Sequence, residues 1–437
     1  MKILIYSANF APEKVGIGKY SGEMADWLAS QGHTVRVVCA PPYYPDWKVD
    51  SGYRKASYQR EVWNEIRIWR CPLWVPAKPS GLKRIVHLLT FAASSFPVML
   101  RHVFWRPDVV LTVAPAFVCA PAGWLTARLA GAQAWLHLQD FEVDIAFQMN
   151  MLKSPLLQRW ALTAERWMLG RFNSVSSISR RMVERLETKG VRQDRIQFFP
   201  NWVDVNHIKP SCDGGAYRRE LGIAEDAIVV LYAGALAAKQ GLHIIPPVAT
   251  MLAKRKDIAF VICGDGVLKH KLASDSEGMT NVHLLPLQPF ERLGELLCMA
   301  DIHLLPQNPS AADLVLPSKL SGMLASGRPV VSTCRPGTDL ESVIALCGLV
   351  VPPGDQEGLA NAICTLADDP VLRLQLGAES RQWAELHVDR EVVLQRMFGD
   401  LTVAPTDRRV PIPVDEPLAL SEADATDAPA QRPAVRV

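Results

Sequence analysis

The 437-residue sequence lacks the cysteine pattern of a disulfide framework or a zinc site. Its nine cysteines are scattered, odd in number and free of any CxxC pair. Because both kinds of site need closely spaced cysteines, we expect reduced thiols and a cytoplasmic protein. The start of the chain, MKILIYSANFAPE, has one lysine, a short apolar run and no small-residue cleavage site. It predicts a first core strand rather than a signal peptide.

The chain also lacks an excess of charge of one sign. Its 47 lysine and arginine residues nearly balance 45 aspartate and glutamate residues, which leaves a net charge of +2 at pH 7. Overall electrostatics therefore do not indicate nucleic acid as a partner. Aromatic residues are missing from residues 403–437, which contain six prolines and mixed charge. This composition predicts a disordered tail.

What the sequence does contain is a repeated pattern of short apolar runs followed by segments of helical period. Strand and then helix, repeated, predicts a parallel sheet covered on both faces. A polar segment rich in proline and glycine, residues 200–215, separates the two halves. We therefore predict an α/β fold of two doubly wound, Rossmann-like domains facing a cleft, with boundaries at 1–205 and 206–400. The expected strands are Ile3–Tyr6, Val35–Cys39, Ile66–Arg70, Val109–Val113, Ala134–Leu138, Val175–Ile178, Ile196–Phe199, Ile228–Ala233, Ala259–Cys263, Val282–Leu285, Ile302–Leu305, Val330–Thr333 and Leu349–Val351.

The most informative stretch is Asp301–Thr333. An apolar strand ends in a polar loop, a helix opens at Pro317, and Gly327 stops it before the next strand. Proline at a helix start and glycine past its end are the usual arrangement. A helix that begins beside the carboxyl end of a strand directs unpaired N–H groups into a crevice. Ser318 and Lys319 add a hydroxyl and a cation there, so we expect a ligand that carries phosphate.

Glycines at two strand ends are further candidates for phosphate contact. Gly16-Ile17-Gly18 lies between the first expected strand and a helix, where backbone N–H groups can approach a diphosphate. A plain tight turn is the alternative. Gly264 and Asp265 follow a strand of the second half and are candidates for lining the ligand crevice there. A role in the turn alone is again the alternative.

Seven segments in this order resemble the retaining GT-B glycosyltransferases of family 4, and most closely their colanic-acid-type branch, over about residues 1–400. The resemblance implies transfer of a sugar from a nucleoside diphosphate donor to an acceptor, with retained anomeric configuration and no required metal. It also implies that the second domain holds the donor and the first receives the acceptor. The segments are NFAPEKVGIGKYSGEMADWL, RPDVVLTVAPAF, LHLQDFEVD, FFPNWVD, LYAGALAAKQGL, FVICGDG and LPSKLSGMLASGRPVV.

The phosphate-binding positions depart from the commonest pattern of that family. Gly234 is followed by Ala235 where many relatives have arginine, and Gln240 precedes Gly241 where they have lysine. Lys239 is adjacent and is a candidate for reaching the same phosphate as a flexible point charge. A solvated loop lysine is the alternative.

The paired glutamates of many relatives are also missing. Their two positions fall on Leu314 and Gly322. Asp313, beside the first position, is a candidate for a hydrogen bond to the donor sugar, and an ordinary loop aspartate is the alternative. The resemblance does not name the group that recognises the ribose.

The catalytic candidates follow the strand Ala134–Leu138. A His-Asp pair of many relatives becomes Gln139-Asp140 here, and His137 lies on the same strand face as Gln139. We predict Asp140 and His137 as catalytic residues, with a satisfied core histidine as the alternative for His137. Glu142 and Asp144 are candidates for an acceptor base. In retaining transfer the leaving diphosphate stabilises the oxocarbenium ion, so electrostatics matter more than a protein nucleophile.

The segment Leu82–Trp105 predicts contact with a membrane. It has basic ends around an apolar middle broken by Pro97, and no acidic residue occurs between Ile66 and Pro107. The apolar middle is too short for a confident membrane span. It fits a helix in the interface of an anionic membrane, with a buried crossover helix as the alternative and a nucleic-acid patch as a third reading. The side chains expected to enter the membrane are Leu88, Leu89, Phe91 and Phe96.

These observations predict a cytoplasmic glycosyltransferase on the inner face of the plasma membrane. Its donor is a GDP- or UDP-sugar and its acceptor a polyprenyl-diphosphate-linked saccharide of exopolysaccharide synthesis, as the resemblance implies. No cofactor and no metal are expected, because no His/Cys/Asp cluster has ligand spacing. Two alternatives remain open, a nucleotide-sugar epimerase of the same fold and a non-catalytic subunit of a polysaccharide-synthesis complex.

Overall fold

The computed structural model describes residues 1–77, 81–114, 117–141, 154–308 and 316–399. Two compact units make up these residues. Unit 1 contains Met1–Trp202 and the segment that begins at Val393, and unit 2 contains Val203–Val392. The predicted tail lies outside the described residues.

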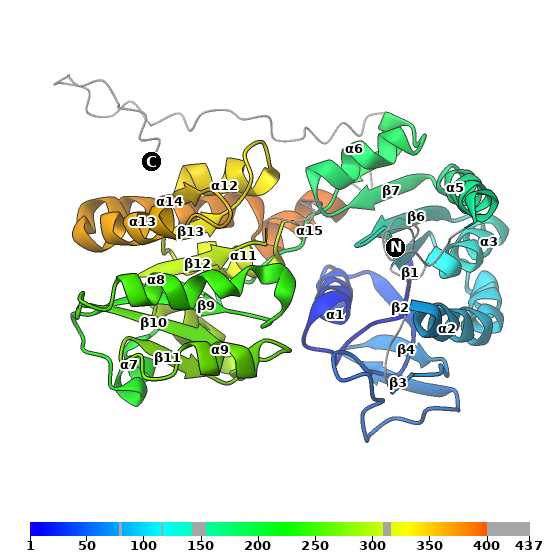
Figure 1. The fold of residues 1–437 in the computed structure, drawn as a ribbon. Helices are drawn as coiled ribbons and strands as arrows, with labels where there is room; N and C mark the ends of the chain where they lie inside the picture. The colour runs from blue at the N-terminus through cyan, green and yellow to red at the C-terminus, as the bar shows by residue number, and fades with distance from the viewer. Residues whose placement is uncertain (78–80, 115–116, 142–153, 309–315, 400–437) are drawn as a thin grey trace. The chain divides into compact units, whose positions relative to one another are not determined.

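Unit 1 is built on an eight-stranded sheet (Figure 1). Its strands are β1 (Lys2–Ser7), β2 (Thr34–Cys39), β3 (Gln59–Trp63), β4 (Ile66–Arg70), β5 (Val109–Ala114), β6 (Gln133–Leu138), β7 (Ser174–Ser177) and β8 (Ile196–Phe198). Their order is β3-β4-β2-β1-β5-β6-β7-β8. All neighbours are parallel except β3 and β4, which are antiparallel.

Strand β3 corrects the expectation of a purely parallel sheet. Its sequence, QREVW, has no apolar run, and none of its residues is buried. An edge strand that is open to solvent carries little of the apolar signal from which strands are predicted. The antiparallel hairpin of β3 and β4 was therefore missed.

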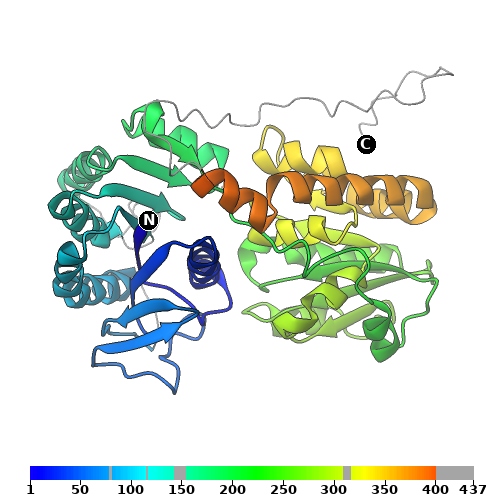
Figure 2. The same ribbon diagram turned by 180° about the vertical axis from the view of Figure 1, so that it is seen from behind.

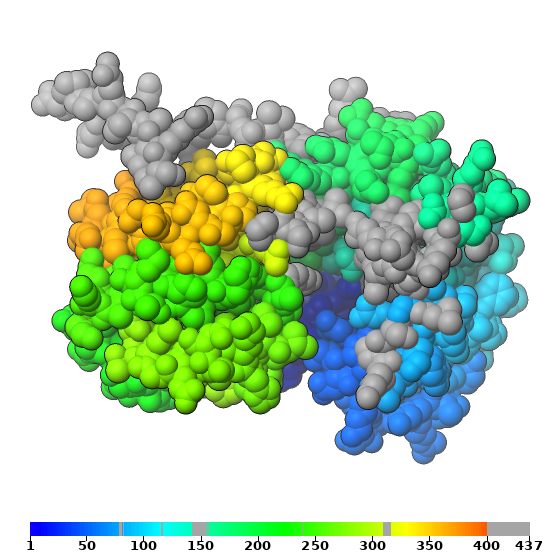
Figure 3. All heavy atoms as spheres, viewed as in Figure 1, coloured from blue at the N-terminus to red at the C-terminus, as the bar shows by residue number. Residues whose placement is uncertain are grey.

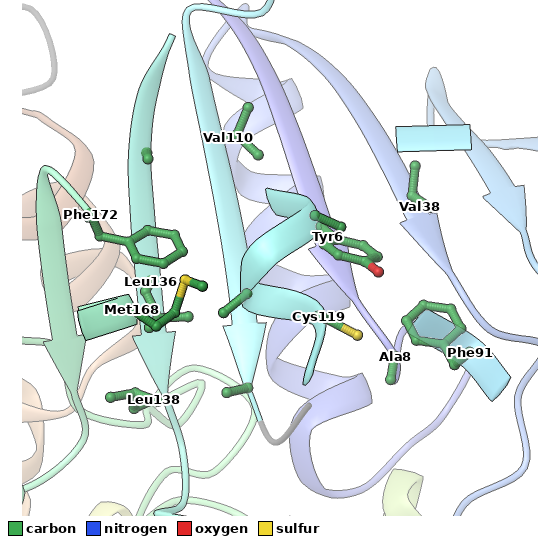
Figure 4. Packing of buried hydrophobic residues seen from close by; sticks show 14 of the residues in the cluster. Tyr6, Ala8, Val38, Phe91, Val110, Cys119, Leu136, Leu138, Met168 and Phe172 are labelled. Atoms are coloured by element: carbon green, nitrogen blue, oxygen red, sulfur yellow. The ribbon is translucent and has the colours of Figure 1, made fainter. Parts of the chain in front are cut away.

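Helices cover both faces of this sheet. On one face, α1 (Gly16–Ser30) and the end of α15 (Arg390–Phe398) pack in one apolar cluster. On the other face, α2 (Gly81–His102), α3 (Ala120–Ala130), α5 (Pro155–Leu169) and α6 (Arg180–Thr188) border a second cluster. Figure 4 shows Phe91 of α2 beside Tyr6 of β1 in that cluster, with the two ring centroids 5.8 Å apart.

Unit 2 has a six-stranded sheet, parallel throughout, with the order β11-β10-β9-β12-β13-β14. Helices lie on both of its faces, and α8 and α9 form much of the surface seen over it in Figure 3. The strands are β9 (Ile228–Ala233), β10 (Ile258–Cys263), β11 (Val282–Leu285), β12 (Ile302–Pro306), β13 (Val330–Thr333) and β14 (Gly348–Val351). The helices are α7 (Gly215–Leu221), α8 (Ile245–Met251), α9 (Lys269–Asp275), α10 (Leu293–Cys298), α11 (Ser318–Ala325), α12 (Asp339–Cys347), α13 (Gln356–Asp368) and α14 (Pro370–His387).

The predicted fold class of two parallel-sheet α/β units is confirmed. Each expected strand is present, and no end differs by more than one residue from the prediction. Near its C-terminal end the chain returns from α14 of unit 2 to pack the end of α15 in unit 1 (Figure 2). Within the described part of the chain, no helix has both the length and the apolar character needed to cross a bilayer.

Candidate active site

Three loops meet at the carboxyl edge of the unit 2 sheet, and glycines make the first contact possible. The N–H of Gly234, after β9, donates to the carbonyl of Cys263, at the end of β10, over 2.9 Å. Gly264 has φ +154°, and a Cβ there would lie 1.9 Å from the carbonyl oxygen of Gly234. Only glycine permits this approach of two backbones. The loops after β9 and β10 therefore form one continuous backbone surface.

The loop after β12 joins the same surface through Gly241. This residue has φ +66°, and a Cβ there would lie 2.7 Å from the carbonyl carbon of Gln307. The side-chain amide of Asn308 donates to the carbonyl of Ala238 over 3.3 Å. Backbone from three strand ends is thereby held together at the end of the sheet where doubly wound folds bind ligands.

Lys319 brings a cation to this surface. Its Nζ donates to Gln240 Oε1 over 2.7 Å and to Tyr232 Oη over 2.9 Å, and it lies 4.2 Å from the centroid of the Tyr232 ring. A Cβ on Gly234 would be 3.4 Å from Lys319 Cδ. Burial raises the pKa of Tyr232, so the phenol stays neutral beside the ammonium. The ammonium of Lys319 thus lies beside Gln240. The family pattern has a lysine at the position of Gln240, so Lys319 brings a cation to the same place.

The first turn of α11 lies beside this cation. The helix begins at Ser318 after Pro317, as predicted, and no side chain caps it. The partial positive charge of a helix N-terminus favours an anion. A cation and a helix N-terminus at the edge of the same loop surface make this part of unit 2 suited to a phosphate.

The structure brings together most of the predicted donor residues. Gly234, Gly264, Pro317, Ser318 and Lys319 all lie at the carboxyl edge of this sheet.

Other donor predictions fall elsewhere or cannot be placed. The backbone of Lys239 lies in a short 3-10 turn, Ala238–Gln240, and its side chain is outside what the structure describes. Asp313 and Leu314 lie outside the described residues. Gly322 faces the core, because a Cβ there would lie 3.2 Å from Leu297 Cδ1.

In unit 1, the glycines of the expected phosphate turn lie inside a helix. The prediction that Gly16 and Gly18 precede the helix is wrong, because α1 begins at Gly16 and the pair forms its first turn. The apolar stripe of this helix starts at Tyr20, so periodicity alone placed the helix start too late. Gly18 is required for packing, since a Cβ there would lie 2.5 Å from Glu13 Cβ.

Glu13 is a buried carboxylate that sequence reasoning missed. It is 6% exposed, and its Oε1 accepts hydrogen bonds of 3.0 Å from the backbone N–H groups of Tyr43 and Tyr44. Asn9 Nδ2 donates to its Oε2 over 3.0 Å. Desolvation raises the pKa of Glu13, and these hydrogen bonds oppose that shift. The available signal in the sequence was a single acidic residue between a proline and a glycine. In the structure, Glu13 connects the loop after β2 to the segment that leads into α1.

Arg70 is a second buried charge at these loops. It is 1% exposed and donates to the carbonyls of Ala40 and Ala11 and to the carboxylate of Glu61. Two buried charged side chains, Glu13 and Arg70, therefore both hold the loops after β1 and β2 together through hydrogen bonds. Such groups rigidify a site when all their hydrogen bonds are made.

His137 lies inside unit 1, with both ring nitrogens occupied. Its Nδ1 lies 3.0 Å from Ser176 Oγ, and Gln139 Nε2 donates to its Nε2 over 2.9 Å. The same amide exchanges hydrogen bonds with Asn201. Burial lowers the pKa of His137 to about 3, which keeps the imidazole neutral. This geometry matches the alternative reading of a satisfied core histidine.

Asp140 is the exposed member of the predicted catalytic pair. It follows β6 at the carboxyl edge of the unit 1 sheet. Glu142 and Asp144 lie outside the described residues. Where the structure describes side chains, no three His, Cys, Asp or Glu residues gather in a group that could hold a metal ion.

Comparison with known proteins gives the same division of the chain. Residues 15–202 match the family model for a glycosyl transferase 4-like domain, and residues 227–369 match that for glycosyl transferases group 1. WcaI of Escherichia coli strain K12, whose name assigns it as a glycosyl transferase of colanic acid biosynthesis, is 39% identical over 414 residues. The match covers 92% of this chain and 100% of WcaI.

Two solved structures show the same fold at low sequence identity. Sucrose-phosphate synthase from Thermosynechococcus elongatus matches with a TM-score of 0.69 and 17% identity, over 92% of this chain and 98% of that one. Anabaena HepE, solved in complex with UDP and glucose, matches with a TM-score of 0.64 and 17% identity, over 92% of this chain and 100% of that one. With WcaI covered over its whole length and both family models matched in order, the chain belongs to the GT-B glycosyltransferases that carry a 4-like domain followed by a group 1 domain.

Proposed function

We propose that this glycosyltransferase moves a sugar from a GDP- or UDP-sugar to a polyprenyl-diphosphate-linked saccharide, with retained anomeric configuration, in colanic-acid-like exopolysaccharide synthesis. The observation that carries the proposal is the cation of Lys319 at the N-terminus of α11, beside the glycine loops of unit 2. The name of WcaI supports the pathway, and the complex of HepE with UDP supports a nucleotide donor for this fold.

In this mechanism unit 2 binds the diphosphate of the donor. The ammonium of Lys319 and the partial positive charge of the α11 N-terminus stabilise the negative charge that grows on the diphosphate as the glycosidic bond breaks. The buried Tyr232 and the half-buried Gln240 hold the ammonium in place through hydrogen bonds. Asp140, exposed at the end of β6, is the side chain of unit 1 that we assign to the donor sugar or the acceptor.

A lipid-linked acceptor requires the enzyme to work at a membrane surface, and α2 supports this. Val86, Leu89 and Phe96 are 42%, 49% and 40% exposed, and their spacing places them on one side of the helix. Phe91, expected to enter the membrane, is instead fully buried in the core. We propose that the exposed stripe of α2 rests on the cytoplasmic face of the plasma membrane.

A single substitution tests the donor site. Lys319→Ala should weaken binding of GDP- or UDP-sugar about tenfold or more, because it removes a charge-assisted contact to phosphate. Isothermal titration calorimetry measures the Kd, and release of nucleoside diphosphate in the presence of lipid-linked acceptor measures turnover. Lys271→Ala is the matched control, since Lys271 is exposed on α9 and pairs with Asp275 of the same helix. Equal Kd values for the two variants, both normally folded, would remove Lys319 from the site.

The same assay separates the alternatives. A transferase releases nucleoside diphosphate only when acceptor is present, whereas an epimerase converts the nucleotide sugar without acceptor. A non-catalytic subunit binds without turnover.

We also propose that the reaction needs no metal. Activity should survive dialysis against EDTA, because Lys319 and the helix N-terminus supply the positive charge at the diphosphate. A complete loss that Mg²⁺ or Mn²⁺ restores would overturn this part of the mechanism.

A further inference from the structure

Unit 1 carries a group of arginines that the proposed chemistry does not use. Strands β2, β4 and β3 place Arg36, Arg67 and Arg60 on one face of the sheet. Arg36 is the register partner of Arg67, and Arg60 is the partner of Trp69. Paired residues of neighbouring strands point to the same face. This is the face that α2 covers further along, since Val38 and Trp69 belong to the cluster packed under α2.

We call the side chains of Arg36, Arg60, Arg67 and Arg101 the arginine patch. Arg101 lies in the last turn of α2, and with Arg36 and Arg60 it is close enough to His102 to lower the pKa of that imidazole, although burial is the larger cause. Arg67 likewise lowers the pKa of Arg36, after burial. Arg67 therefore acts on Arg36, and Arg36, Arg60 and Arg101 act on the same imidazole at the end of α2.

No acid neutralises the arginine patch within the described part of the chain. None of the four guanidinium groups forms an ion pair or a side-chain hydrogen bond there. The three strands and α2 contain a single acid, Glu61, and it pairs with Arg70 on the opposite face. Uncompensated cations held side by side repel one another, so an anion bound to them would stabilise this face.

Aromatic residues hold the patch in a fixed arrangement. The guanidinium carbon of Arg36 lies 4.2 Å from the ring centroid of Trp105 and 5.4 Å from that of Trp69. Its Nε is buried without a partner, and the ring of His102 packs edge-on against Trp69 at 4.5 Å. Stacking leaves the outer N–H groups of an arginine available to a bidentate acceptor such as phosphate.

Apolar side chains at the same place favour a membrane over a soluble anion. Phe104, next to Trp105, is 90% exposed, and Val62, the register partner of Arg67, is 70% exposed. The exposed stripe of α2 leads along the helix to Arg101. A surface that combines exposed aromatic and aliphatic groups with unpaired cations is complementary to an anionic bilayer.

We propose that the arginine patch binds the phosphate groups of anionic phospholipids and so fixes the end of α2 on the membrane. This inference rests on the membrane association proposed above. It assigns that association chiefly to the arginine patch beyond the end of α2, rather than to the exposed stripe of α2 alone. Arg36 and Arg67 of the patch lie towards the amino ends of β2 and β4, whereas Asp140 follows β6 at the carboxyl edge. The patch is therefore separate from the reacting groups.

The test is binding of the full chain to vesicles, without donor or acceptor. Wild type should sediment with vesicles that contain phosphatidylglycerol and not with pure phosphatidylcholine. Each arginine near an anionic surface contributes about fivefold, so Arg36→Gln/Arg60→Gln/Arg67→Gln should lose about a hundredfold in partition coefficient. Because Arg36 is stacked between tryptophans, the double variant Arg60→Gln/Arg67→Gln, which leaves that stack intact, should still lose about thirtyfold.

The control removes the same number of charges from unit 2. Lys254→Gln/Lys256→Gln/Lys271→Gln changes exposed lysines outside both sites and should leave vesicle binding within about twofold of wild type. Equal binding of wild type to neutral and anionic vesicles, or undiminished binding by the folded double variant, would overturn the inference.

Failure of the inference is distinguishable from failure of the proposed function. The arginine variants should keep normal turnover with a short water-soluble acceptor analogue and lose turnover with acceptor embedded in vesicles. Normal vesicle binding without any sugar transfer would instead refute the transferase proposal and leave the arginine patch intact.

Discussion

A methyl group at Gly264 should damage unit 2 more than a methyl group at any open glycine turn. The Cβ of Gly264→Ala would lie 1.9 Å from the carbonyl oxygen of Gly234 and 3.5 Å from Leu236 Cδ2. The φ of +154° is a region that is essentially restricted to glycine, and it costs an L-residue about 1–3 kcal/mol. Forcing the loops apart adds about 1–3 kcal/mol. We expect a total loss of about 3 kcal/mol or more.

Gly278→Ala is the matched control, because it isolates the backbone cost. Gly278 also has a positive φ, +77°, but nothing lies within 4 Å of the Cβ that alanine would add. Its cost should be the conformational one alone, about 1–2 kcal/mol. For a unit of this size about 1 kcal/mol corresponds to about 2–4 °C in Tm, so Gly264→Ala should melt at least 6 °C below wild type.

Two measurements check this reasoning. Thermal unfolding followed by circular dichroism gives the difference in Tm between the variants, and calorimetric titration with GDP- and UDP-sugar gives donor affinity. Gly264→Ala should also bind donor more weakly, because the displaced loop carries the backbone beside Lys319. If the two alanine variants unfold at the same temperature and bind donor equally, the close contact of the two loops does not exist in solution.

Three further results are expected. Glu13→Ala should cost about 2–4 kcal/mol in urea unfolding, because it leaves the N–H groups that Glu13 satisfies without an acceptor, and Glu13→Gln should cost less. Folding raises the pKa of Glu13, so above pH 4.5 the native state binds more protons than the unfolded state. The stability of wild type should therefore fall as the pH rises from 4.5 through the raised pKa. Glu13→Gln should lack this loss, and a Glu13→Gln variant with the wild-type pH profile would contradict the assignment. Folding lowers the pKa of His137 to about 3, so its contribution has the opposite sign and is lost as pH falls from 6.5, an effect that should be absent from the pH profile of a His137→Gln variant. Lys189→Met should cost about 3–5 kcal/mol, because it removes the ammonium that pairs with the buried carboxylate of Glu165. Lys189→Met/Glu165→Leu should recover much of that loss in the same unfolding assay, and a double variant no better than the single one would show that the pair is not the cause.

Patterns along the chain were enough to predict every strand of unit 2 and every strand of unit 1 except β3. Expected strands such as Val109–Val113 and Ala259–Cys263 are runs of apolar residues that are buried on both faces, and such a run has few other stable arrangements in a parallel sheet. The start of α11 was predictable in the same way, because Pro317 and Gly327 mark the ends of a short helix through their own backbone preferences. Lys319 followed as a phosphate candidate from its place in the first turn.

The sequence by itself therefore determined which segments become strands and helices, and that a cation stands at the N-terminus of α11. Only the tertiary structure decided which side chains meet across the loops. Gly264 is required because the backbone of Gly234 lies against it, and Glu13 is buried because the loop with Tyr43 folds over it. The hairpin strand β3 and the arginine patch it helps to form also depend on pairing between segments. Local patterns carry the preferences of neighbouring residues. The close approach of two loops, the burial of a charged side chain and the clustering of arginines on one sheet face arise instead from contacts between residues distant in sequence, which no local pattern records.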